Sequence, residues 1–134
     1  LASKTKGAIT YAELSVAATY RLGLTSVINK AGNAILPSSD SAAAAGGVAT
    51  IDDATGVLTF DYLTTDSDAY PFTATTYALV STKYGDAAKA KAVKSTLEFH
   101  AFKCPGLYPA LGFASVTPAS KFGAIVALVS NVMR

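Results

Sequence analysis

The sequence predicts an α/β fold, because segments with the pattern of strands alternate along the chain with segments that have the pattern of helices. The clearest strand pattern covers residues 72–81, which are rich in threonine, tyrosine, leucine and valine. The clearest helix pattern covers residues 86–102, where apolar side chains recur at helical spacing. Asp86 stands at the start of this segment and is a residue type that favours the N-cap of a helix.

Shorter elements are predicted before residue 35. Residues 7–11 follow a polar lead-in with β-branched and aromatic side chains, which indicates a short strand. Residues 12–22 have apolar side chains at roughly helical spacing, and Gly23 is a plausible end for that helix. A second strand is expected at 25–29, followed by turn residues at 30–34, so this part indicates a hairpin-like excursion.

An alanine-rich helix is predicted next, at residues 42–45. Ser38 to Ser41 offer N-cap side chains before it, and Gly46-Gly47 is expected to close it. Beyond it we expect a strand, a turn and an alternating, half-buried strand, at residues 48–51, 52–56 and 57–62.

Two prolines should end or interrupt the long helix. Pro105 and Pro109 carry no backbone N–H and cannot continue a regular helix. After them the sequence indicates a short extended piece at 111–114 and a last helix over about 118–132.

Composition excludes several classes of function. With 51% hydrophobic and 15% charged residues, the 134-residue chain is not disordered and is long enough for one ordinary domain. A net charge of +2 is too small to imply a nucleic-acid partner. Apolar runs such as residues 124–129 fall far short of the ~20 residues that a membrane span needs.

The residue types that commonly form catalytic sites in enzymes do not form a recognisable catalytic set in this sequence. His100 is the single histidine, and Cys104 is the single cysteine. A Cys-His pair on one helix would need that helix to reach Cys104, but Pro105 restricts the residue before it. We therefore expect no catalytic residue and no enzyme activity, with His100 on a helix and Cys104 packed as a small apolar side chain.

Acidic pairs and a serine cluster are the remaining candidates. The pairs Asp52/Asp53 and Asp66/Asp68 do not fit a calcium-binding loop, so we interpret them as turn residues and expect no metal site and no cofactor. Ser38, Ser39 and Ser41 could instead hold an anion at a helix N-terminus. Asp40 among them repels an anion, which favours plain capping.

The order of several motifs resembles the bacterial phosphate-binding proteins, the extracytoplasmic receptors of the phosphate-specific ABC transporter. The most specific match is Asp68-Ala-Tyr-Pro-Phe-Thr-Ala-Thr-Thr-Tyr-Ala-Leu-Val80. Other matches are Gly7 to Glu13, the Asn-Lys-Ala-Gly-Asn stretch at 29–33 with Leu36-Pro37-Ser38, the helix with Lys89 to Lys94 and Leu97 to Phe99, and Leu111 to Ala114. The stretch from His100 to Pro109 departs from that family, which has an unbroken helix there.

The resemblance implies the C-terminal portion of a type II periplasmic-binding-protein-like fold with two lobes. Residues 1–69 would then finish the second lobe, and residues 70–134 would return into the first. A complete member of that family is more than twice this length. None of its phosphate ligands has a counterpart in this sequence, so the ligand-binding residues stay unknown.

The function implied by the resemblance is an extracytoplasmic receptor for inorganic phosphate, or a fragment of one, that delivers phosphate to the membrane permease of an ABC transporter. Its location would be periplasmic or extracellular, with lipid anchoring before processing as an option. We expect the chain to need a missing N-terminal segment or a second copy of itself. The alternative is a non-catalytic interaction or scavenging polypeptide without a ligand site of its own.

Overall fold

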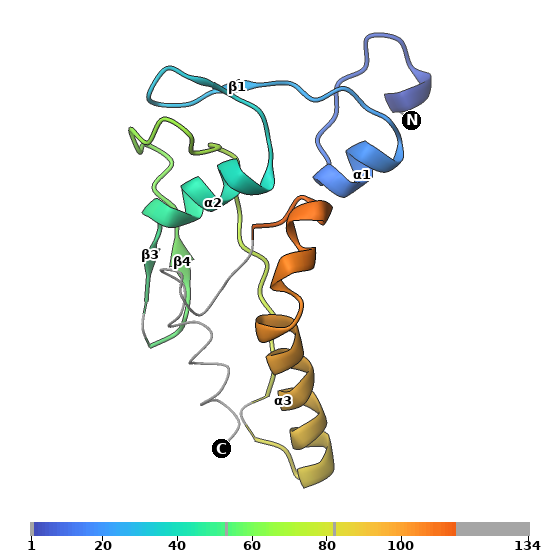
Figure 1. The fold of residues 1–134 in the computed structure, drawn as a ribbon, viewed down its shortest axis with the longest axis vertical. Coiled ribbons are helices and arrows are strands. Elements are labelled where there is room, and N and C mark those ends of the chain that lie inside the picture. The colour runs from blue at the N-terminus through green and yellow to red at the C-terminus, as the bar shows by residue number, and fades with distance from the viewer. Residues whose placement is uncertain (1, 53, 82, 115–134) are drawn as a thin grey trace.

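The computed structural model describes residues 2–52, 54–81 and 83–114, in which helices are mixed with two small antiparallel sheets (Figure 1). This mixture of elements leaves the two-lobed architecture a prediction. In chain order the elements are η1 (Ala2–Lys4), α1 (Leu14–Thr19), β1 (Val27–Ile28), β2 (Ala34–Ile35), α2 (Ser39–Val48), β3 (Thr50–Ile51), β4 (Leu58–Thr59), α3 (Ala87–Phe102), η2 (Pro105–Leu107) and η3 (Pro109–Leu111), where η marks a 3₁₀ helix.

The longest helix, α3, lies where the sequence predicts it. The Asp86 carboxylate accepts hydrogen bonds from the backbone N–H groups of Ala88, at 2.8 Å, and Lys89, at 3.4 Å, which satisfies two donors of the first turn. The helix ends at Phe102, and the first proline of the following 3₁₀ helices is Pro105. The expected apolar stripe is half-buried along its length, at Ala90, Val93, Leu97 and Ala101.

Removal of the Asp86 cap should weaken α3. We expect Asp86→Ala to cost about 1 kcal/mol, because two backbone donors lose their acceptor. Urea denaturation followed by far-ultraviolet circular dichroism measures the loss. Lys91→Ala, on an exposed position of the same helix, is the control and should leave the midpoint in place. Equal midpoints for Asp86→Ala and the control would contradict the capping role.

Two hairpins confirm the predicted turns. Strand β1 pairs with β2, with Val27 opposite Ile35, and β3 pairs with β4, with Thr50 opposite Thr59. The turn between β3 and β4 is held by Asp52, whose carboxylate accepts the N–H groups of residues 54 and 55 at 2.8 and 3.1 Å. These two hydrogen bonds hold the pKa of Asp52 below its ordinary value.

Helix α2 corrects one prediction about glycine. Ser38 caps it as expected, but Gly46 and Gly47 lie inside the helix rather than closing it. The helix instead ends at Val48, where Ala49 takes an extended backbone conformation. Glycine inside a helix costs only about 1 kcal/mol relative to alanine, so the pair does not by itself stop the helix.

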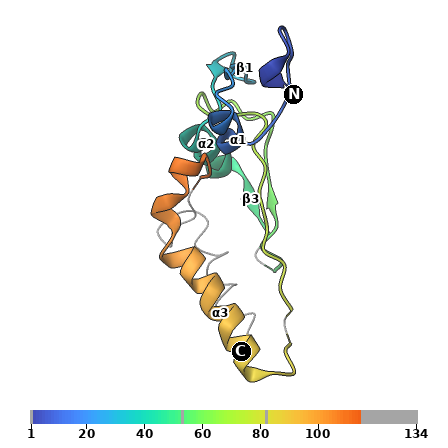
Figure 2. The same ribbon diagram turned by 90° about the vertical axis from the view of Figure 1, so that its right-hand side faces the viewer.

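Three strand or extended predictions are wrong for this chain. Residues 7–11 and 72–81 belong to no sheet in the described part of the structure, and Leu111 ends a 3₁₀ helix. A strand exists only beside a hydrogen-bonded neighbour, and the strands in the described residues are two residues long and pair within their own hairpins. Figure 2 shows residues 72–81 descending on one side while α3 rises on the other. The helix predicted at 118–132 lies outside the described residues.

Small side chains make up what is buried. The buried apolar residues of the described part are Ala17, Ala45, Ala49, Ala69 and Cys104, and none of its large side chains is fully buried. Large apolar side chains face solvent instead: Tyr11 is 98%, Leu79 93% and Ile9 90% exposed. Among the described residues, none of the helices has the length and apolar character of a membrane span.

Candidate functional site

The best-built polar site of the described chain is centred on Asn29, which follows strand β1 and is 7% exposed. Its side-chain N–H group donates to the backbone carbonyls of Asp66 and Ser67, each at 3.1 Å, and of Ala69, at 3.4 Å. Its side-chain oxygen accepts the Asn33 N–H at 3.0 Å. One buried amide therefore joins the first hairpin to the loop that precedes residue 70.

The loop that precedes residue 70 is also stabilised by hydrogen bonds within itself and by one hydrogen bond to α2. The Asp66 carboxylate accepts the N–H groups of Asp68, at 2.9 Å, and Ala69, at 3.1 Å. The Tyr70 N–H donates to the Ser41 carbonyl at 3.1 Å, which ties the loop to α2. Asp66 is thus a turn residue, as predicted. The buried Ala69 lies between the hairpin and the helix.

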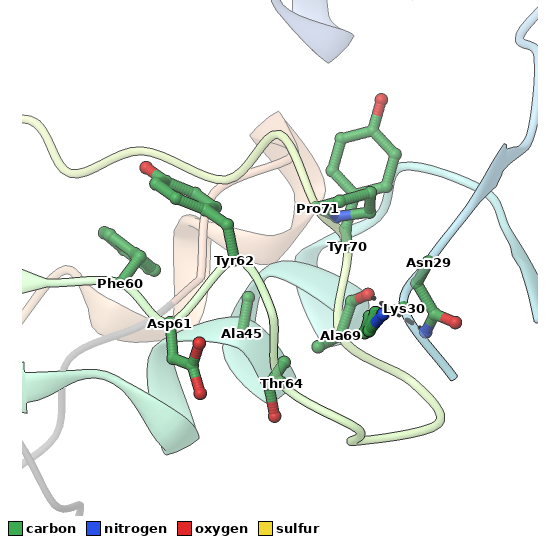
Figure 3. Close-up of a pocket in the computed structure, with 10 residues that line it drawn as sticks. All are labelled: Asn29, Lys30, Ala45, Phe60, Asp61, Tyr62, Thr64, Ala69, Tyr70 and Pro71. Atoms are coloured by element: carbon green, nitrogen blue, oxygen red, sulfur yellow. Dashed lines mark hydrogen bonds between the residues drawn. The ribbon is translucent and has the colours of Figure 1, made fainter. Parts of the chain in front are cut away.

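A hollow opens beside this junction (Figure 3). It is lined by Asn29, Lys30, Ala45, Phe60, Asp61, Tyr62, Thr64, Ala69, Tyr70 and Pro71. Its cavity volume of about 10 Å³ is roughly the space of one water molecule, whereas small-molecule pockets typically enclose roughly 300–1,000 Å³. The hollow brings one cation, Lys30, and one carboxylate, Asp61, to its rim, which is a weak set of groups for an anion.

The serine cluster at the start of α2 is occupied by capping. The Ser38 hydroxyl accepts the Ser41 N–H at 3.0 Å, and the Ser41 hydroxyl accepts the Ser38 N–H at 3.0 Å. Ser41 also donates to the Leu36 carbonyl at 2.9 Å. These two hydroxyls complete a capping box. They are therefore already engaged with the protein, in agreement with the capping interpretation.

His100 and Cys104 lie close together in the sequence, near the C-terminal end of α3, and the contacts in this region are structural. The Tyr108 hydroxyl donates to the His100 carbonyl at 2.9 Å and lies 3.3 Å from His100 Nδ1. Burial raises the pKa of Tyr108, and the neighbouring Cys104 raises it further. Cys104 is buried, as predicted, and lies beyond the end of α3. These contacts fasten the 3₁₀ turns to the helix.

The described residues hold no group of three or more histidine, cysteine, aspartate or glutamate side chains with the spacing of a metal site. Asp52 acts in its turn and Asp66 in its loop, which agrees with the turn interpretation for both. Asp53 lies outside the described residues.

Sequence reasoning missed the importance of Asn29. The signal was available in part, because Asn29 begins a stretch of turn residues through Gly32, whose N–H donates to the Asn29 carbonyl at 3.0 Å. The long-range contacts to residues 66–69 leave no local pattern, so only the folded arrangement identifies them.

Comparison with known proteins adds no assignment to this geometry. No model of a protein family, no curated protein and no solved structure matches the chain.

Proposed function

We propose that the chain is the later part of an extracytoplasmic receptor for inorganic phosphate that supplies the membrane permease of an ABC transporter. The observation that supports this proposal is the junction at Asn29. Three stretches with resemblance to the receptor family meet there: the Asn29–Asn33 turn, the start of α2, and the segment from Asp68. Their shared hydrogen bonds hold these three stretches together in the described chain.

The chemistry of such a receptor is binding without catalysis. Phosphate is recognised by hydrogen-bond donors in a closed cleft, and the described residues bring no such set together. Lys30 stands alone at the rim of the hollow, and the Ser38 and Ser41 hydroxyls are engaged in the capping box. On the resemblance, the phosphate-holding groups would come from upstream sequence.

Phosphate binding and intact mass test the proposal together. We expect the 134-residue chain alone not to bind labelled phosphate at micromolar concentration in equilibrium dialysis. The native polypeptide should have more than twice the 13.7 kDa mass of this chain and should bind phosphate in preference to sulfate. A native polypeptide of 13.7 kDa that binds no phosphate would contradict the receptor and favour the non-catalytic interaction polypeptide.

Tight, phosphate-selective binding by the 134-residue chain itself would show that its ligands are not upstream. Ser38→Ala, Ser39→Ala and Ser41→Ala would then be the first variants to test. Ser95→Ala, on an exposed position of α3, is the matched control.

A further inference from the structure

The segment 74–81 leaves its backbone unpaired within the described part of the chain. None of its N–H or C=O groups forms a hydrogen bond with another residue that the structure describes, whereas the flanking Thr73 carbonyl accepts the Tyr62 hydroxyl at 3.2 Å. The Tyr77 hydroxyl, a side-chain group, accepts the Leu58 N–H at 2.8 Å. The segment is thus attached to β4 by the Tyr77 hydroxyl, while its own backbone donors and acceptors stay open toward the other described residues.

The first half of this stretch has the exposure pattern of a strand. Residues 72, 74 and 76 are exposed and residues 71, 73 and 75 are half-buried, whereas residues 77, 78 and 79 are all exposed. Such alternation places one set of side chains against the protein and the other toward solvent. Phe72 is 72% and Leu79 93% exposed, so apolar side chains accompany the open backbone.

Nothing in the sequence protects this edge. Exposed strand edges are commonly blocked by charged side chains, but no charged residue occurs between Asp68 and Lys83. An edge of this kind accepts another strand, because backbone hydrogen bonds supply the affinity.

The segment also complements itself. In an antiparallel pair centred on Thr76, Phe72 lies opposite Val80 of a second copy, and Ala74 lies opposite Ala78. An aromatic residue opposite a β-branched one is a favourable cross-strand pair, and Thr76 opposite its own copy can form a hydroxyl pair. No like charges face one another in this register.

The surface area permits such a partner. The chain exposes 9321 Å², about 2,700 Å² more than the ~6,600 Å² expected for a compact monomer of this mass. A stable interface buries roughly 1,200–2,000 Å² in total. We propose that two copies of this chain join by antiparallel pairing of residues 72–81, with Thr76 on the two-fold axis. This inference stands independently of phosphate binding.

Sedimentation equilibrium of the 134-residue chain tests the pairing. The expected mass is twice 13.7 kDa. Thr76→Lys places two lysines directly opposite one another and should weaken dimerisation at least tenfold. Thr65→Lys, on an exposed loop residue, carries the same charge change and should leave the dimer intact. Thr76 is exposed in the single chain, so circular dichroism of the two variants should agree.

Cross-linking tests the register. Under mild oxidation, Thr76→Cys should give a covalent dimer that a reducing agent dissolves, and Thr65→Cys should not. The wild-type chain should give none, because Cys104 is buried. A wild-type monomer, a dimer that Thr76→Lys leaves unchanged, a dimer in which Thr76→Cys fails to cross-link, or occupation of the edge by a different polypeptide would each overturn the proposal.

Discussion

Replacement of Asn29 by aspartate is expected to destabilise the described fold more than any other change of similar size. Asn29→Asp keeps the shape of the side chain but replaces its N–H donor with a carboxylate oxygen. That oxygen would face the carbonyls of Asp66, Ser67 and Ala69, which now accept the amide hydrogens. We expect a loss of roughly 2–4 kcal/mol, because one buried and two part-buried acceptors lose their donor and a charge is added beside them.

Chemical denaturation followed by circular dichroism measures this loss. The matched control is Asn33→Asp, because Asn33 is exposed and its side-chain N–H makes a single 3.3 Å hydrogen bond to the Ser67 carbonyl. We expect the control to cost about 1 kcal/mol or less. A typical domain has only ~5–15 kcal/mol of stability in total, so the difference between the two variants should be plain in the midpoint. Equal losses would mean that the Asn29 junction does not stabilise the fold.

A methyl group at Gly112 should also be strongly destabilising. Gly112 follows η3 with φ +80°, and a Cβ added there would lie 2.5 Å from Cβ of Leu14 in α1. The Leu14 Cβ is fixed to its backbone, so α1 would have to move. We expect Gly112→Ala to cost about 1–2 kcal/mol for the left-handed conformation and a further ~1–3 kcal/mol for overpacking.

Gly32→Ala separates these two contributions. Gly32 has φ +88°, close to that of Gly112, but nothing lies within 4 Å of an added Cβ there. This variant should show the conformational cost alone, as a smaller shift of the denaturation midpoint. If Gly112→Ala is no more damaging than Gly32→Ala, the contact between α1 and the end of η3 is absent in solution.

The sequence predicted those elements whose cause is local. Asp86 caps the start of α3, and Pro105, which has no backbone N–H, follows its end; Asp52 forms its turn through neighbouring N–H groups. Both causes act within a few residues, so they leave a pattern that can be recognised in the sequence.

Elements that depend on a distant neighbour could not be predicted in the same way. Residues 72–81 have strand composition, but a strand forms only beside a partner, and none lies beside them in the described chain. The Asn29 junction also depends on residues far away in the sequence, but in this case the partners are present in the described chain. The hydrogen bonds that the Asn29 side-chain N–H group donates span 37 to 40 residues, so no periodicity or spacing in the sequence predicts them.

The small size of the buried side chains also determines how the chain responds to temperature. The heat capacity of unfolding arises mainly from apolar surface that becomes hydrated. Because the described part fully buries only alanines and a cysteine and leaves its large apolar side chains partly exposed, unfolding this part hydrates less apolar surface than unfolding a core of large side chains. The stability curve of the described part is therefore flatter than the usual ~12–15 cal/mol/K per residue would give.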